Sequence, residues 1–265
     1  MSLPAPGPDR TAVVTGASSG IGAEIARELS HGGHHVTLVA RSADKLEELA
    51  AELGDADVVA MDLADRAGRA SLLQRVEENG RVIDILVNNA GLSTLGAVSR
   101  SDPENEMNMI EVDVVAVADL CSRILPGMVE RGRGAVLNVA STAAFQPLPG
   151  QAGYGAGKAF VLSYTQSLAG ELRGTGVTAT TLCPGPVHTG FGERAGFSKE
   201  DAEAALPAVM WVTAADVAKS AVEGMAKGRL VVIPGKVNRV AAALSQVTPR
   251  TLLLPVLAKG HPGLR

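Results

Sequence analysis

Short apolar runs rich in β-branched residues alternate along the chain with longer stretches in which apolar residues recur every three or four positions. The short runs predict strands, and stretches such as Ile21, Ile25 and Leu29 predict helices. Strands that alternate with helices form βαβ units, so we expect an α/β single-domain Rossmann fold: a doubly wound parallel sheet of about seven strands with helices on both faces. The predicted strands are Ala12–Thr15, His35–Ala40, Asp57–Met61, Asp84–Asn88, Ala135–Ala140, Val177–Leu182 and Leu230–Ile233.

The two ends of the chain differ from its middle. The first ten residues, MSLPAPGPDR, have neither a positively charged start nor an apolar core, so they do not form a secretory signal. We expect a disordered leader over 1–9, one folded domain over 10–235 and a basic extension of that domain over 236–265. No apolar run approaches the roughly 20 residues that span a bilayer, and the expected location is the cytoplasm.

The first predicted strand runs into a glycine-rich turn, and a predicted helix begins at once. Glycine fits where φ is positive or where the backbone must approach a ligand closely, and free N–H groups at a helix start bind a pyrophosphate. The alternative is a glycine-rich turn without a ligand. The spacing G-x-x-x-G-x-G differs from the common G-x-G-x-x-G fingerprint. The residues expected to bind a dinucleotide here are Gly16, Ser18, Ser19, Gly20, Ile21 and Gly22.

The residues after the second and third predicted strands bear on which dinucleotide binds. An NAD site places a carboxylate after the second strand, where it accepts hydrogen bonds from the ribose 2′-OH. Here Arg41 stands in that region, and its planar guanidinium suits a 2′-phosphate. We therefore expect NADP(H) to be preferred over NAD(H), the alternative being that Arg41 is a solvated surface residue. Asp62, followed by Leu63, is placed either to bind the adenine amino group or to cap a helix that starts near Asp65.

Three residues after the fifth predicted strand suit proton transfer. Tyr154 and Lys158 lie four positions apart in a predicted helix, so they share one face. A nearby ammonium group lowers the pKa of a phenol, which can then protonate a nascent alkoxide or deprotonate an alcohol. Ser141 can donate a hydrogen bond to the same substrate oxygen. The alternative is an exposed Tyr/Lys pair, because Y-x-x-x-K alone is common by chance.

Five motifs together resemble the short-chain dehydrogenase/reductase family over about residues 10–235. They are TGASSGIG, NNAG after the fourth strand, Ser141, Y-x-x-x-K and the Pro-Gly pair after the sixth strand, in family order and spacing. The resemblance implies that Tyr154 is the acid/base, that Lys158 binds the nicotinamide ribose and lowers the tyrosine pKa, and that Ser141 orients the substrate oxygen. It also implies a mobile lid over about 188–212 and a homodimer or homotetramer. The further cofactor contacts that it implies are Asn89, Ala90, Gly91, Tyr154, Lys158, Pro184, Val187 and Thr189.

One position departs from the family pattern. Family members usually have asparagine in the long helix before the fifth strand, where its main-chain carbonyl helps a water link the lysine to a proton path. This chain has Asp113 there. We count Asp113 among the catalytic residues, because it retains the carbonyl and its carboxylate would stabilise Lys158 as an ammonium. The alternative is that the helix simply buries a protonated or paired Asp113.

The expected function is NADP(H)-dependent hydride transfer between nicotinamide and the carbonyl or secondary alcohol carbon of a small molecule. The alternative is a slow nucleotide-binding regulator that keeps the fold, which the intact Ser141, Tyr154 and Lys158 disfavour. Epimerisation or dehydration is disfavoured because the chain lacks an extra substrate domain. The substrate is expected to be hydrophobic, because the candidate pocket residues are mostly apolar: Leu92, Thr94, Ala143, Phe145, Leu148, His188, Phe191 and Met210.

Charge and cysteine content narrow the range of partners. The net charge of −4 gives no indication of nucleic-acid binding. Cys121 and Cys183 are too few for a cysteine-rich metal site, and we expect buried thiols and no metal. The last 42 residues, from Gly224, contain seven Lys or Arg and no Asp or Glu. We favour packing of this segment on a neighbouring subunit over contact with an anionic membrane surface or an extended lipid-like substrate pocket.

Overall fold

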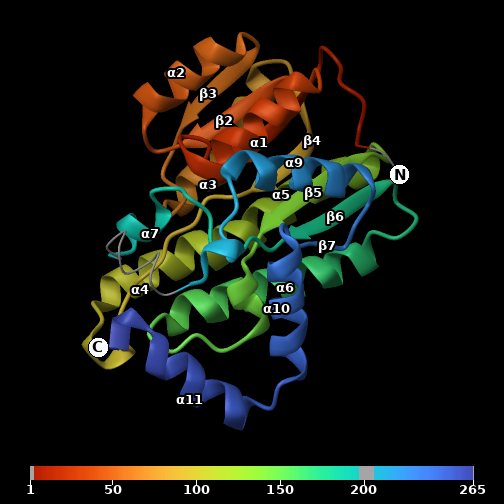
Figure 1. Ribbon diagram of the computed structural model, residues 1–265. Helices are drawn as coiled ribbons and strands as arrows, with labels where there is room; N and C mark the ends of the chain where they lie inside the picture. Colours follow the sequence, from red (N-terminus) through yellow and green to blue (C-terminus); the bar gives the residue numbers. More distant parts are fainter. Residues whose placement is uncertain (1–2, 197–205, 265) are drawn as a thin grey trace.

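A computed structural model describes residues 3–196 and 206–264, and it contains one sheet of seven parallel strands (Figure 1). The order across the sheet is β3-β2-β1-β4-β5-β6-β7, so the chain leaves the centre in one direction and returns to continue in the other. This confirms the predicted doubly wound parallel sheet. The strands are β1 (Arg10–Thr15), β2 (Val36–Ala40), β3 (Ala56–Ala60), β4 (Val82–Asn88), β5 (Gly134–Val139), β6 (Val177–Leu182) and β7 (Val231–Val232).

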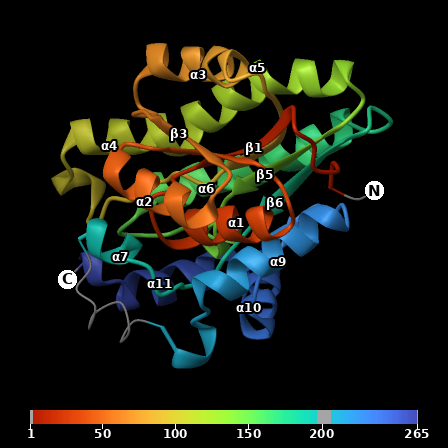
Figure 2. The ribbon, with the colours of Figure 1, turned by 90° about the horizontal axis from the view of Figure 1, so that it is seen from above.

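Helices cover both faces of this sheet, as Figure 2 shows from above. Neighbouring residues of β1 pack on opposite faces, because side chains alternate along a strand. Val14 joins a core cluster with α1, α2 and α9, and Val13 joins one with α3, α5 and α6. The helices described are α1 (Gly20–His31), α2 (Ala43–Leu53), α3 (Arg66–Glu78), α4 (Pro103–Ile110), α5 (Ala116–Glu130), α6 (Ala152–Glu171), α7 (Phe191–Arg194), α9 (Ala214–Ala226), α10 (Lys236–Val247) and α11 (Arg250–Gly260).

The N-terminal segment differs from the disordered leader that the sequence predicts. Within residues 3–9, Leu3 packs against the core cluster of α1, and Arg81 donates a hydrogen bond to the Pro8 carbonyl at 2.6 Å. The amide of Val82 also donates to the Asp9 carbonyl at 2.8 Å. These contacts fix the segment against the sheet before β1 begins. Residues 1–2 lie outside the described part of the chain.

The C-terminal part continues past the sheet as two helices. After β7, which is shorter than the four residues predicted, α10 and α11 run along the outside of the molecule (Figure 1). Of the predicted lid, residues 188–196 and 206–212 are described, and 197–205 lie outside the described residues. Within the described part of the chain, no helix combines the length and the apolar character needed to cross a bilayer.

Candidate active site

The glycine-rich turn between β1 and α1 leaves the start of a helix open. Gly16 and Gly20 have φ of +65° and +58°, which side chains other than glycine rarely adopt. Ser19 is the N-cap of α1 but its side chain accepts no hydrogen bond from the helix, so the first N–H groups are free to meet an anion. A Cβ on Gly20 would lie 3.0 Å from Thr189. The turn and the segment after β6 therefore face each other.

Hydrogen bonds fasten this turn to the end of β4. The Asn89 side chain donates to the Thr15 carbonyl at 2.9 Å, and the buried Thr15 hydroxyl accepts from the amides of Asn89 and Ala90 at 2.9 and 3.1 Å. The predicted cofactor residue Asn89 thus has its side chain turned toward the glycine-rich turn. Thr15 was not among the predicted residues, because a threonine that ends a strand carries no distinguishing signal in the sequence.

The residues expected on the adenine side lie at the ends of β2 and β3. Arg41 is exposed and, among the described residues, forms no ion pair or hydrogen bond. Asp62 accepts a hydrogen bond from the Ala64 amide at 2.9 Å. The N-cap of α3 is Asp65, whose side chain accepts from the Ala67 amide, so the alternative role of Asp62 as that cap is wrong. The carboxylate of Asp62 is exposed and keeps capacity for a further donor.

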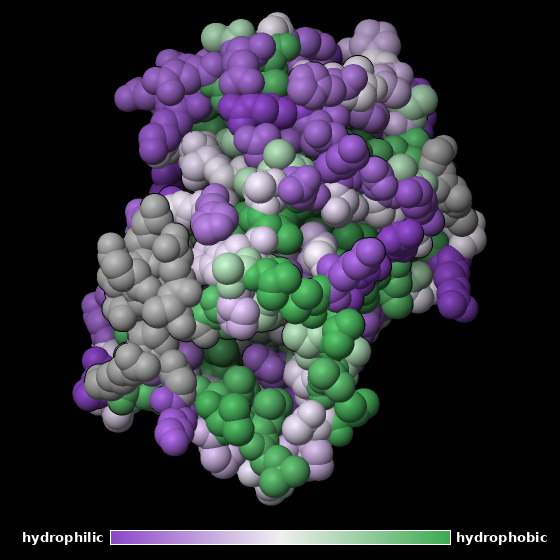
Figure 3. All heavy atoms as spheres, viewed as in Figure 1, coloured by the Kyte–Doolittle hydropathy of each residue, from purple (hydrophilic) through white to green (hydrophobic). Residues whose placement is uncertain are grey.

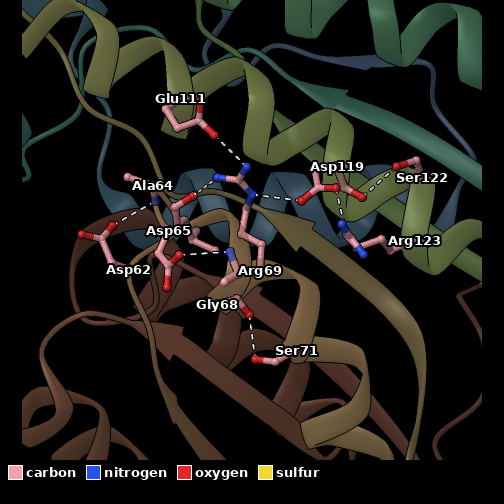
Figure 4. Close-up of polar contacts among 12 residues, drawn as sticks. Asp62, Ala64, Asp65, Gly68, Arg69, Ser71, Glu111, Asp119, Ser122 and Arg123 are labelled. Carbon is pink, nitrogen blue, oxygen red and sulfur yellow. Dashed lines mark hydrogen bonds and ion pairs between the residues drawn. The ribbon is translucent and has the colours of Figure 1, made fainter. Parts of the chain in front are cut away.

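Arg69 joins the segment after β3 to the region where α4 meets α5 (Figure 4). Its guanidinium is fully buried, and it donates to the Leu63 carbonyl, to Glu111 at 2.7 Å and to Asp119 at 3.0 Å. Glu111 opens the π-helical turn Glu111–Val115 between α4 and α5, and Asp113 lies in the same turn. Sequence reasoning missed Arg69, because its position in a strongly polar helix resembles that of an exposed arginine.

A buried ion pair lies next to Tyr154, the predicted acid/base. Lys158 Nζ lies 3.0 Å from Asp113 Oδ2 and donates to the Val139 carbonyl at 3.2 Å. The other oxygen of Asp113 accepts from the Leu92 amide at 2.7 Å. A Cβ on Gly91 would lie 3.2 Å from Lys158 Nζ, so the glycine of the NNAG motif makes room for the pair. The structure therefore agrees with the alternative in which Asp113 is paired and buried, and it joins Asp113 to Lys158 directly.

Each charge of this pair favours the charged form of the other, against the effect of burial. Burial raises the pKa of the Asp113 carboxyl, against the opposing effect of the Lys158 charge and of the Leu92 amide. Burial alone would lower the pKa of Lys158, but the Asp113 carboxylate outweighs it and raises that pKa above its usual value. Lys158 is therefore an ammonium at neutral pH, as the sequence predicted.

Opposing effects act on the pKa of Tyr154. Lys158 lies 5.6 Å from the centre of the Tyr154 ring, and its charge and the hydrogen bond with Ser141 both lower the tyrosine pKa. Burial raises it by more, and the Asp113 charge adds to that rise, so the net direction is upward. The expected lowering of the Tyr154 pKa by Lys158 is present but does not prevail. Tyr154 is therefore a protonated phenol at neutral pH.

The candidate substrate residues separate into two places. Phe191 of the lid lies with its ring centre 5.9 Å from that of Tyr154, and His188 stacks on Trp211 at 4.5 Å. Thr94 donates a hydrogen bond to Glu106. Phe145 and Leu148 instead line a cavity of about 530 Å³ with Ala152, Ala156 and Arg250, and positions 152 and 156 of α6 lie on the face opposite Tyr154. Phe145 and Leu148 are thus not placed to meet a substrate that Tyr154 protonates.

The model of the short chain dehydrogenase family matches residues 10–199. The chain belongs to this family of oxidoreductases, which act on hydroxyl and keto groups with NAD(P). It is 38% identical over 193 residues to an uncharacterized oxidoreductase of Staphylococcus epidermidis, covering 70% of this chain and 84% of that one. It is 36% identical over 216 residues to the NADP-dependent 3-hydroxy acid dehydrogenase YdfG of Salmonella typhimurium, covering 76% and 87%.

Solved structures of short-chain dehydrogenases share the fold over nearly the whole chain. A short-chain dehydrogenase from Sphingobium yanoikuyae in complex with NADPH has a TM-score of 0.79 at 34% identity, covering 93% of this chain and 95% of that chain. A 7β-hydroxysteroid dehydrogenase has a TM-score of 0.85 at 25% identity, covering 97% and 99%. These matches extend beyond β7, so the C-terminal helices have counterparts in at least some relatives.

The two cysteines of this short-chain dehydrogenase are buried, as the sequence predicted. Cys121 and Cys183 are buried and unpaired, and burial raises the pKa of each thiol to about 12. Among the described residues, no group of three or more His, Cys, Asp or Glu side chains is arranged to hold a metal ion.

Proposed function

We propose that this short-chain dehydrogenase transfers hydride between NADP(H) and the carbonyl or secondary alcohol carbon of an apolar small molecule. One observation carries the proposal: Tyr154, whose ring centre lies 5.6 Å from the buried Lys158 ammonium, lies at the carboxyl edge of the sheet, where Ser141 follows β5. Ligands of open parallel sheets bind outside that edge. The uncapped start of α1 lies at the same edge.

The residues of this edge fit a phosphorylated dinucleotide. A Cβ on Gly22 would collide with the Asn89 side chain and the Gly16 carbonyl, so α1 begins as close to β1 as backbone allows. Its free N–H groups suit a pyrophosphate, and the unpaired guanidinium of Arg41 suits a 2′-phosphate. The NADPH complex of the Sphingobium relative and the printed NADP dependence of YdfG support the same cofactor.

NADPH supplies the hydride when bound, and the side chains of this chain govern the proton. In reduction, Tyr154 donates its proton to the substrate oxygen as that oxygen gains negative charge, and Ser141 holds the oxygen by a hydrogen bond. Lys158 stabilises the phenolate that remains, and Asp113 keeps Lys158 charged.

The substrate class follows from the lid. Phe191 presents an aromatic ring beside Tyr154, and the only described ammonium near that hydroxyl, Lys158, is already paired with Asp113. Within the described residues, a substrate carboxylate would find no free lysine there, whereas an apolar ketone would pack against the Phe191 ring. We infer a hydrophobic ketone or secondary alcohol. We also infer a homodimer or homotetramer and a cytoplasmic location, as the sequence and its resemblance predict.

The test is a panel of apolar and charged ketones with NADPH and with NADH, followed by nicotinamide absorbance, in the native protein and in Arg41→Ala. We expect kcat/KM with NADPH to exceed that with NADH by about 10- to 100-fold, and Arg41→Ala to lose most of that preference. Equal use of both cofactors by the native protein would contradict the NADP(H) assignment. Tight NADPH binding without turnover of any ketone would instead favour the nucleotide-binding regulator.

A further inference from the structure

The two C-terminal helices present apolar side chains to the outside. Figure 3 shows hydrophobic residues gathered over α10 and α11. On α10 the exposed residues Val237, Val240, Leu244 and Val247 follow one another at intervals of three or four, which places them on a single face of the helix. Val240 and Leu244 are each 59% exposed and Val247 is 78% exposed, values expected for polar surface residues.

The same helix turns polar residues toward the protein. Asn238 is 1% exposed and donates hydrogen bonds to the carbonyls of Met210 and Pro234, and Ser245 is 7% exposed and donates to the Ala242 carbonyl. Asn238 and Ser245 share the inner face of α10 with the buried Ala242, whereas the apolar stripe lies on the outer face. On α11, Leu252 and Val256 extend the apolar surface, with 65% and 70% exposure. An outward apolar face of this kind marks a contact with something outside the chain.

The charges around this face indicate what it contacts. Lys236, Arg239 and Lys259 are exposed on the same two helices, and none of them forms an ion pair within the described residues. Residues 224–265 contain no Asp or Glu. If two copies met through this face about a two-fold axis, each would bring the same lysines and arginines to the interface, and this segment would offer no carboxylate to neutralise them. An anionic lipid surface supplies that neutralisation throughout.

We propose that α10 and α11 form a membrane-docking face that rests on an anionic bilayer surface, with the apolar stripe in the headgroup boundary and the flanking cations over lipid phosphates. Helices that lie in the membrane interface combine such a stripe with Lys and Arg. The sequence alone favoured a neighbouring subunit for this segment; the outward stripe and the unpaired cations favour the lipid surface instead. The proposal does not depend on the reaction that the enzyme catalyses.

The experiment is co-sedimentation of the full chain with vesicles of phosphatidylcholine and with vesicles that also contain phosphatidylglycerol at about a third of the lipid. We expect binding to the anionic vesicles only, weakened by salt. The variant Leu244→Ser/Val247→Ser should bind at least about tenfold more weakly, and so should Lys236→Glu/Arg239→Glu. The matched control is Val129→Ser, because this residue is 39% exposed on α5, which Figure 2 shows on the opposite side of the molecule from α10, and the change should leave binding unchanged.

Two further measurements keep the outcome clear. NADPH affinity and the thermal midpoint should stay at native values in all three variants, which shows that the fold is retained. Equal binding to neutral and anionic vesicles, or native binding by Leu244→Ser/Val247→Ser, would overturn the proposal. Light scattering after gel filtration tests the competing occupant: if Leu244→Ser/Val247→Ser converts an oligomer to monomers and the native chain ignores vesicles, the face belongs to a second copy.

Discussion

The carboxyl edge of the sheet and the C-terminal helices use polar groups in opposite ways. At the sheet edge, Asp113 and Lys158 are buried together, and each also forms a hydrogen bond with the backbone of a neighbouring segment. On α10 the polar residues Asn238 and Ser245 are buried, and the larger apolar residues Val240, Leu244 and Val247 are exposed. Burying charge is costly unless it is paired, so the polar groups of the first region make their contacts inside the protein. The apolar groups of the second region face outward, toward a contact outside the chain.

The largest expected effect comes from breaking the buried pair. Lys158→Met leaves the Asp113 carboxylate without its partner. We expect the free energy of unfolding to fall by about 3–5 kcal/mol and nearly all carbonyl reduction activity to be lost. Urea denaturation and steady-state rates measure the two effects. The control is Lys227→Met, which removes an exposed lysine paired with Glu223 and should cost less than about 1 kcal/mol. Equal stability of Lys158→Met and the native protein would mean that the pair is not buried as described.

A smaller effect is expected when the link across the site is removed. Arg69→Met loses the hydrogen bonds to Leu63, Glu111 and Asp119, and we expect about 2–3 kcal/mol of destabilisation. NADPH affinity should also fall about tenfold, because Leu63 and the adenine side lose their anchor. Titration of NADPH by fluorescence and urea denaturation provide the measurements. Arg123→Met, which removes a half-exposed ion pair with Asp119, should leave NADPH affinity unchanged. Unchanged NADPH affinity in Arg69→Met would show that Arg69 contributes to the stability of the fold alone.

The charge of Asp113 sets a pH limit that can be moved. The Asp113 carboxylate raises the pKa of Tyr154, so Asp113→Asn should lower that pKa while Asn still accepts from Leu92. Reduction needs the protonated phenol and should decline at a lower pH than in the native enzyme. Alcohol oxidation needs the phenolate and should begin at a lower pH. The profiles of kcat for both directions test this, and profiles that coincide with the native ones would show that Asp113 acts on Lys158 alone.

The smallest expected effect separates the two regions by stability. Leu244→Ser should change the free energy of unfolding by less than about 0.5 kcal/mol, because the side chain is already exposed. Leu86→Ala in the fully buried β4 should cost about 2–5 kcal/mol. Thermal denaturation of the two variants, without lipid, makes the comparison. A large loss in Leu244→Ser would mean that α10 packs its apolar face within the protein.

The sheet and the shared helix face of Tyr154 and Lys158 could be predicted, because their signals are local. Buried parallel strands appear as continuous apolar runs, as in Ile85 to Val87, and Tyr154 and Lys158 reach one helix face by their spacing alone. The family motifs placed Ser141 and Gly91 with them. The disordered leader was predicted from local composition, whereas Leu3 joins the core through contacts with residues that are distant in the sequence.

What could not be predicted depends on burial and on partners far along the chain. The ion pair between Asp113 and Lys158 was one of several alternatives, since only the fold decides whether they meet. Arg69 contacts residues up to 50 positions away and has no motif. Periodicity predicts that α10 is amphipathic but not that its apolar side faces outward, because apolar faces ordinarily pack inward.

The most direct test of the central claim is Tyr154→Phe, which removes one hydroxyl and keeps the ring that packs beside Phe191. With the best ketone of the panel, we predict that kcat for reduction by NADPH falls by about 10²- to 10⁴-fold. NADPH affinity and the thermal midpoint should remain near native values. A Tyr154→Phe enzyme that retains reduction within a few-fold of the native rate would contradict the assignment of Tyr154 as the proton donor, and with it the account of the buried pair behind it.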